Sequence, residues 1–305
     1  MPLVRPLRLA VVGFGRVGQA CAEAIGLSQD LNVAALIRRA AAVEGKFPDR
    51  LRQVPVFTHI GQASDLDGAL ICVPTHNAAE SASQILQHGV PIVDCVTLHG
   101  EAFQTHKETI HKRALHHKTT AIVGAGWDPG ALSVFRSWFA LLAPGGKTET
   151  THRPGVNLRH TAMARSVAGV KDALCAEVRA ADGRLQRYVY VQLEQGANVD
   201  RVAEAIRADP LFLGEETHVF PMESLASLEQ EGRGVVLDRR GPPGRLGHQH
   251  FVLEGRFDEA LLTAQVMLAA ARALPSLEPG AYSLAEVPLS ALWGEKAEKG
   301  EQEWL

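Results

Sequence analysis

Three glycines near the beginning of the chain have the spacing of a phosphate-binding turn. Gly13, Gly15 and Gly18 follow an apolar run over residues 7–12 and precede a helix predicted over 20–27. In such a turn the first glycine permits the tight bend, the second lets the backbone approach a pyrophosphate, and the third lets the helix pack against the strand. The N-terminus of the helix offers unpaired N–H groups to the anion. The spacing therefore predicts the dinucleotide-binding turn of a Rossmann fold.

Two arginines follow the second predicted strand, where the ribose of the adenosine should lie. This strand spans residues 33–37 and leads into Arg38 and Arg39. About twenty residues past the glycines, an NAD-binding chain carries an acid that accepts a hydrogen bond from the 2′-hydroxyl. Two planar guanidinium groups instead suit the 2′-phosphate of NADP. The pair therefore favours NADP, and the alternative is an ordinary pair of solvated loop arginines.

A second segment with chemical potential reads Gly-Ala-Gly-Trp-Asp-Pro-Gly over residues 124–130. It follows a predicted strand and precedes a helix predicted over 131–142. Ligands of parallel α/β sheets gather at the carboxyl ends of the strands, which is where this turn begins. Trp127 and Asp128 are therefore candidates to hold a ligand. The alternative for Asp128 is the N-cap of the following helix, a common role for aspartate.

Alternating strands and helices must position these residues. Strands are predicted at 54–57, 69–73, 91–96 and 120–124, helices at 78–87 and 102–117, and a loop near the adenosine end at 41–49. This alternation predicts an α/β fold whose N-terminal Rossmann domain is a doubly wound parallel sheet. The strand at 69–73 ends in Pro74 and Thr75, which would meet the nicotinamide side of a cofactor seated on the first turn.

Six histidines invite a metal-site interpretation, because they cluster in two short stretches. They are His106, His111, His116 and His117 in the predicted helix at 102–117, and His248 and His250 beyond it. A spacing of five residues does not stack side chains on one helix face, and no acid or cysteine near either group completes a coordination sphere. We therefore expect no metal, and we interpret the helical histidines as a solvated helix face.

Beyond Pro144 the pattern changes. Strand-like segments at 148–153, 188–193, 217–222, 234–238 and 250–254 alternate with helical segments at 163–178 and 199–208, and residues 241–244 indicate a hairpin-like turn. This predicts a second, α+β domain built on a mostly antiparallel sheet and suited to cover a cofactor cleft. A helix rich in alanine and leucine, predicted at 261–274, returns to the first domain.

Composition excludes several classes of partner. The 305 residues carry a net charge of −3, which gives no electrostatic basis for binding nucleic acid or an anionic membrane. Neither a membrane span nor a signal peptide is predicted. Four cysteines without C-x-x-C spacing predict free, buried thiols in a reducing compartment, and we expect a cytoplasmic protein. They are Cys21, Cys72, Cys95 and Cys175.

Taken in order, these motifs resemble those of the meso-diaminopimelate dehydrogenase family. The resemblance runs from about residue 8 to 290, and its most specific part is Gly126-Trp-Asp-Pro-Gly130. The other matching stretches are Gly13 with Arg38-Arg39, Cys72–Thr75, Pro154-Gly155, Ala168–Ala173 and Leu262–Met267. The resemblance implies oxidative deamination at a D-configured α-carbon with NADP, in a homodimer, with Trp127 and Asp128 as catalytic residues that hold and orient the ammonium and carboxylate of that centre.

The resemblance also implies that the chain forms two domains with different roles. Residues 1–125, with the returning segment 260–290, would form the NADP-binding domain, and residues 126–259 the substrate-binding and dimerisation domain. We expect NADP to contact the glycine turn, the arginine pair and the following strand ends. These residues are Gly13, Phe14, Gly15, Arg16, Val17, Arg38, Arg39, Cys72, Val73, Pro74, Thr75, Cys95, Val96 and Ala125.

The predicted substrate pocket departs from the family pattern. Thr97 replaces an acid, Arg159 enters a loop of small residues, and Glu177, Arg233 and about Glu259 replace neutral hydrogen-bonding residues. A buried charge without a partner costs several kcal/mol, so these changes predict a substrate other than meso-diaminopimelate. The expected substrate contacts are Thr97, Asp128, His152, Arg159, Glu177, Arg187, Arg233 and Glu259.

These residues lead to a hypothesis in which Asp128 anchors the reacting amine, Trp127 lines the pocket, and Arg159 or Arg187 binds a carboxylate. Glu177 and Glu259 suit a second cationic group, as in a basic D-amino acid. They are equally compatible with a structural network of ion pairs. Two other functions stay open: an NADPH-dependent reductase of imines or 2-oxo acids, and a catalytically inactive NADP-binding sensor, for which Thr97 in place of an acid is the best support.

Overall fold

The chain divides into two compact units. Unit 1 comprises Met1–Leu141 and Glu259–Leu305, and unit 2 comprises Leu142–Asp258. The computed structural model describes residues 5–39, 49–153, 158–179, 185–214, 216–225, 233–242 and 249–294. The boundary differs from the one expected at 125/126, because residues 126–141 belong to unit 1, where Trp127 and Leu132 are buried.

Unit 1 is built on a seven-stranded sheet with the order β13-β6-β5-β4-β1-β2-β3, and every described pairing in it is parallel. The strands are β1 (Leu7–Val12), β2 (Leu31–Ile37), β3 (Val56–Phe57), β4 (Gly68–Ile71), β5 (Ile92–Asp94), β6 (Thr120–Val123) and β13 (Gly280–Ser283). The predicted parallel Rossmann sheet is confirmed. The edge strand β13 was not predicted and lies beside β6.

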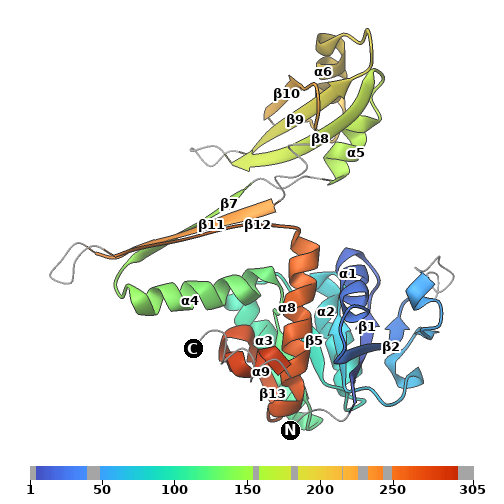
Figure 1. Cartoon of the computed structure of the whole chain (residues 1–305), viewed down its shortest axis with the longest axis vertical. Coiled ribbons are helices and arrows are strands. Elements are labelled where there is room, and N and C mark those ends of the chain that lie inside the picture. Colours follow the sequence, from blue (N-terminus) through green and yellow to red (C-terminus); the bar gives the residue numbers. More distant parts are fainter. Residues whose placement is uncertain are drawn as a thin grey trace. The chain divides into compact units, whose positions relative to one another are not determined.

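Helices cover both faces of this sheet (Figure 1). They are α1 (Arg16–Ile25) and α8 (Glu259–Ala273) on one face, and α2 (Thr75–Leu86) and α3 (Gly100–His116) on the other. Successive strand residues point to opposite faces, so Leu9 and Val11 of β1 pack with α1 and α8, whereas Ala10 and Val12 pack with α2 and α3. Both faces of β1 are therefore buried, as is typical of a parallel sheet.

Short elements complete unit 1. A short turn, η4 (Trp127–Ala131), in which the backbone of Asp128 is non-helical, leads into α4 (Leu132–Leu142). The remaining elements are η2 (Asp49–Leu51), η3 (Ile60–Gln62), η5 (Leu274–Ser276), η6 (Leu284–Glu286) and α9 (Leu289–Trp293). Within the described ranges, none of the helices combines the length and the apolar character needed to cross a membrane.

Among its described residues, unit 2 contains two three-stranded sheets and two helices. One sheet has the order β12-β11-β7 and is antiparallel. In the other, of order β10-β9-β8, β8 and β9 are antiparallel while β9 and β10 are parallel. The elements are β7 (Lys147–Arg153), α5 (Leu158–Arg165), β8 (Val170–Arg179), β9 (Leu185–Leu193), α6 (Val199–Ala208), β10 (Glu216–Pro221), β11 (Arg233–Arg240) and β12 (His250–Phe257). The predicted mostly antiparallel α+β domain is confirmed.

One predicted element of unit 2 is wrong. The alanine-rich segment 163–178 was predicted to be a single helix, but α5 ends at Arg165, a turn follows, and Val170 begins β8. Hydrogen bonding to β9 outweighs the helix propensity of the alanines, since tertiary context overrides such preferences. Two predicted connections, at 41–49 and 241–244, lie largely or partly outside the described residues.

Candidate active site

The glycine turn has the shape that a bound pyrophosphate requires. Gly13 adopts a φ of +87°, and a Cβ there would lie 2.8 Å from the carbonyl oxygen of Cys72. A Cβ at Gly18 would overlap the carbonyl oxygen of Gly13, so α1 can approach the strand only without a side chain. At Gly15, in contrast, nothing lies within 4 Å of such a Cβ. The turn is therefore closed toward the protein and open at Gly15, next to the N-terminus of α1.

Arg38 lies beside this turn. It directly follows β2, and its backbone N–H donates to the carbonyl of Phe57 at 2.9 Å. Its guanidinium carbon lies 5.4 Å from the centroid of the Phe14 ring, within range of a cation–π contact. Arg39, the next residue, is exposed. The structure thus brings Arg38, the first of the predicted arginine pair, close to Phe14, which lies between Gly13 and Gly15.

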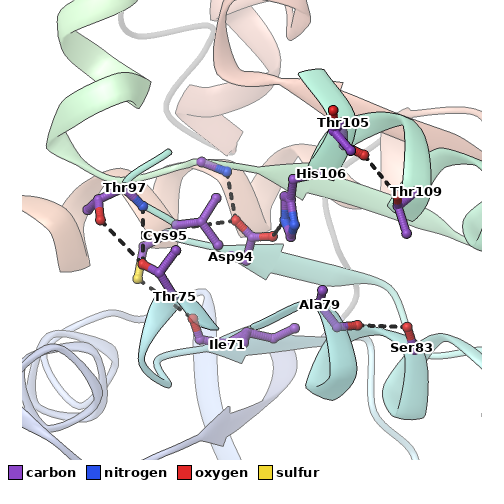
Figure 2. Close-up of polar contacts among 12 residues, drawn as sticks. Ile71, Thr75, Ala79, Ser83, Asp94, Cys95, Thr97, Thr105, His106 and Thr109 are labelled. Atoms are coloured by element: carbon purple, nitrogen blue, oxygen red, sulfur yellow. Dashed lines mark hydrogen bonds and ion pairs between the residues drawn. The ribbon is translucent and has the colours of Figure 1, made fainter. Parts of the chain in front are cut away.

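Two threonines join the start of α2, which follows β4, to the loop after β5 (Figure 2). The backbone N–H of Thr97 donates to Oγ1 of Thr75 at 3.4 Å, and the two hydroxyl oxygens are 3.3 Å apart. Two residues before Thr97, the Cys95 thiol donates a hydrogen bond to the carbonyl oxygen of Ile71, the last residue of β4, at 3.7 Å. The structure therefore brings together Thr75, Cys95 and Thr97, which were predicted to contact cofactor or substrate.

A buried carboxylate that we did not predict organises the same edge of the sheet. Asp94, the last residue of β5, is fully buried. Its Oδ1 accepts hydrogen bonds from the N–H groups of Gly124 at 2.7 Å and Val96 at 3.2 Å, and its Oδ2 pairs with Nε2 of His106 at 2.8 Å. Its carbonyl accepts from Ala125 at 2.7 Å. Asp94 thus joins the ends of β5 and β6 to α3 (Figure 2).

The interpretation of the α3 histidines as solvated is wrong for His106, which is 8% exposed. His106, Ile110 and Ala114 are all buried and lie four residues apart, on the stripe of α3 that faces the sheet. That periodicity was a signal in the sequence, and it marks His106 as a core residue. His111 is exposed, yet its Nδ1 accepts from the N–H of Ala281 in β13 at 2.9 Å.

The segment that carries Trp127 and Asp128 leaves the sheet directly after this network. The N–H of Trp127 donates a hydrogen bond to Oγ1 of Thr263 in α8 at 3.4 Å. The indole of Trp127 is buried, and the centroids of the Trp127 and Phe135 rings are 6.4 Å apart. The Asp128–Pro129 peptide bond is cis. The carboxylate of Asp128 accepts a hydrogen bond from Arg136 at 3.1 Å. Asp128 interrupts the helical turn with an extended backbone (φ −128°, ψ 121°), which is the conformation of an N-cap residue, so its alternative role at the start of the helix is compatible with the ion pair to Arg136.

The Cys95 thiol at this edge of the sheet is not reactive. Burial, and secondarily the charge of Asp94, raise the pKa of the Cys95 thiol to about 12, so this thiol stays protonated at neutral pH. The Cβ of Cys95 lies 3.5 Å from the position that a Cβ at Gly126 would occupy, so this uncharged side chain adjoins the segment that carries Trp127. Among the described residues, no three His, Cys, Asp or Glu side chains gather in a way that would hold a metal ion.

The other predicted substrate contacts fall on both units. Glu259 begins α8 in unit 1, one turn before Thr263, on the helix face that meets Trp127. Arg187 in β9 is 3% exposed, and Glu177 stands opposite it in the register of β8. His152 lies in β7, Arg159 in α5 and Arg233 at the start of β11, and the side chains of these three and of Glu177 lie outside the described residues.

We predict that Asp94→Ala destabilises the protein by about 3–5 kcal/mol, because the Gly124 N–H and His106 lose their buried acceptor. Asp94→Asn keeps an oxygen for Gly124 and loses less. Urea-induced unfolding measures both losses. Glu108→Ala, at an exposed position of α3, is the matched control and should change stability by less than about 0.5 kcal/mol. Equal stabilities for Asp94→Ala and the control would contradict the role given to this carboxylate.

Comparisons with known proteins agree with this geometry. Residues 7–113 match a family model described as an oxidoreductase family with an NAD-binding Rossmann fold. An engineered D-amino acid dehydrogenase superimposes with a TM-score of 0.74 at 22% identity, covering 98% of this chain and 100% of that one. The Corynebacterium glutamicum DAP dehydrogenase in complex with DAP superimposes with a TM-score of 0.69 at 22% identity, covering 99% of this chain and 100% of that one. These two matches show a shared fold.

Relatives in sequence identify the family. A meso-diaminopimelate D-dehydrogenase of Corynebacterium glutamicum is 25% identical over 306 residues, 92% of this chain and 93% of that protein. The enzyme of the same name from Bacteroides fragilis is 35% identical over 303 residues, 99% of this chain and 99% of that protein. With this identity over nearly the whole of both chains, the protein belongs to the meso-diaminopimelate D-dehydrogenase family.

Proposed function

We propose that the protein is an NADP-dependent dehydrogenase that oxidatively deaminates a D-configured amino acid centre. The observation that carries this proposal is the placement of Asp128 and Trp127. A carboxylate and an indole directly follow the end of β6, at the carboxyl edge of a Rossmann sheet, and are held there by residues of α4 and α8. A carboxylate suits a substrate ammonium group, and the buried indole suits a wall that excludes water from it.

The residues of unit 1 fit the proposed cofactor. The open side at Gly15 and the N-terminus of α1 would receive the pyrophosphate. Arg38 and Arg39 would bind the 2′-phosphate, and the strand ends near Thr75 and Cys95 would line the nicotinamide side. When bound, NADP supplies the acceptor for the hydride that leaves the substrate.

The roles of the chain's own residues follow from the reaction. Asp128 accepts hydrogen bonds from the ammonium group and so orients the α-carbon, and Trp127 shields that carbon from solvent. Loss of a hydride and a proton converts the amine to an imine. Water adds to the imine carbon, and ammonia leaves as the 2-oxo acid forms. The reverse direction is the reductive amination of the oxo acid.

The proposed substrate is a basic D-amino acid rather than meso-diaminopimelate. Thr97 stands where the family pattern has an acid, so the loop after β5 carries one negative charge less. The backbone N–H of Thr97 is hydrogen-bonded to Thr75. Glu177 and Glu259 are proposed to favour a second cationic group, and Arg159 or Arg187 to bind a carboxylate. The contacts of His152 and Arg233 with substrate stay predictions, as does a substrate-binding role for unit 2.

A panel of D- and L-amino acids tests the activity, with D-lysine, D-ornithine and meso-diaminopimelate included and NADPH formation as the measurement. We expect turnover of D-enantiomers, highest for the basic ones. Asp128→Ala should lower kcat/KM about 10–100-fold, because it removes a hydrogen bond to a charged group. Glu204→Ala, at an exposed position of α6, is the control variant. Tight NADPH binding without turnover of any amino acid would favour the sensor, and turnover of meso-diaminopimelate alone would refute the pocket argument.

The cofactor preference is tested separately, by titrating NADPH and NADH against the protein. We expect Arg38→Ala and Arg39→Ala each to weaken NADPH binding about 10–100-fold and to leave NADH binding nearly unchanged, since only NADPH carries the 2′-phosphate. Arg113→Ala, at an exposed position of α3, should change neither. A ratio of NADPH to NADH affinity that survives both substitutions would make the arginines an ordinary solvated pair.

A homodimer is part of the proposal, and α4 offers a surface for it. Trp138 is 50% exposed and Leu141 is 73% exposed on this helix. Large exposed apolar side chains that gather in this way are typical of protein interfaces. We expect Trp138→Glu to convert a dimer to a monomer in sedimentation experiments, whereas the neighbouring Ser137→Glu leaves the dimer intact. A Trp138→Glu variant that sediments as the dimer would exclude this surface.

A further inference from the structure

Both members of the Trp127–Asp128 pair contact a residue eight positions later in the chain. The Trp127 ring lies 6.4 Å from the ring of Phe135, and the Asp128 carboxylate accepts from the guanidinium of Arg136 at 3.1 Å. Asp128 has a non-helical backbone, so α4 follows a kink, and side chains of a helix lean toward its N-terminus. Phe135 and Arg136 of α4 therefore reach back over the turn that precedes their own helix and brace the two adjacent residues.

The ion pair is partly enclosed. The side chain of Asp128 is 17% exposed and that of Arg136 is 31% exposed, so solvent screens their attraction less than at an open surface. The same carboxylate oxygen, Oδ1, lies 4.0 Å from Nδ1 of His99. A hydrogen bond between two ionised groups is roughly twice as strong as one between neutral groups. This contact therefore restrains the side-chain rotation of Asp128.

We propose that Arg136 is a positioning residue, which holds the Asp128 carboxylate oriented toward the substrate amine. The inference rests on the proposed function of Asp128. Orientation matters because a carboxylate that rotates freely must lose that freedom when substrate binds, whereas a restrained one has already lost it. Arg136 acts through Asp128, so its removal costs activity only while the Asp128 carboxylate is present.

A double-mutant cycle tests this dependence. The variants are Arg136→Met, Arg136→Lys, Asp128→Asn and the double variant Asp128→Asn/Arg136→Met, assayed with the D-amino acid of the panel that has the highest kcat/KM. We expect Arg136→Met to lower kcat/KM about tenfold and Arg136→Lys to recover part of the loss. In the Asp128→Asn background, Arg136→Met should cost little more. Losses that multiply in the double variant would overturn the proposal and indicate that Arg136 contacts the substrate itself.

Three controls separate positioning from general damage. Ser137→Ala, at the next and exposed position of α4, should keep full activity. NADPH affinity and the thermal midpoint of Arg136→Met should match those of the unmodified protein. A loss of NADPH binding in that variant would show damage to the whole site and would overturn the assigned role.

Crystal structures of the unmodified protein and Arg136→Met, each with NADP, give a readout that needs no turnover. We expect the Asp128 carboxylate to leave its observed rotamer in the variant. An unchanged and equally ordered rotamer would overturn the role of Arg136, whatever the activity. Absence of amino acid oxidation by the unmodified protein would instead refute the proposed function, so the two failures are distinguishable.

Discussion

The buried carboxylate of Asp94 holds together the loops at the carboxyl edge of the sheet in unit 1. Its oxygens bind the backbone of Gly124 and Val96 and meet His106, so one charge links the ends of β5 and β6 to α3. A charge this deep in the interior is tolerated only with such partners, because desolvation without them costs several kcal/mol. The network sets the direction in which the chain leaves β6 toward Trp127. The candidate site thus depends on a residue outside the motifs that reveal it.

A second constraint comes from the far end of the chain. Helix α8 binds the backbone of Trp127 through Thr263, and its Arg272 forms a bidentate ion pair with Asp30, at 2.6 and 3.0 Å, just before β2. Between these contacts, Met267 packs against Cys21 of α1 with the two sulfurs 3.9 Å apart. One helix therefore contacts both the segment that carries Trp127 and Asp128 and the first βαβ unit. The C-terminal segment is thus integral to the fold of unit 1.

In the proposed function, the charges around Asp128 decide which substrate the site accepts. The scaffold of sheet, turn and Trp-Asp pair keeps its shape through backbone and buried contacts. Arg136 and His99 lie beside the Asp128 carboxylate. Thr97, in the loop after β5, donates its backbone N–H to Oγ1 of Thr75, and the two hydroxyl oxygens are 3.3 Å apart. In the proposed function, a neutral Thr97 where the family pattern has an acid changes the substrate preference while the reaction is retained.

Local rules determined much of this protein from its sequence. Glycine spacing specifies the turn at Gly13 because it reports backbone geometry within a few residues, and the alternation of apolar segments specifies the parallel sheet for the same reason. Propensity failed at 163–178, because β8 exists only through its pairing with β9. Tertiary structure alone joined Asp94 to His106 and Asp128 to Arg136. Such pairs depend on side-chain direction and on burial, which a linear sequence does not record until the helices and strands are packed.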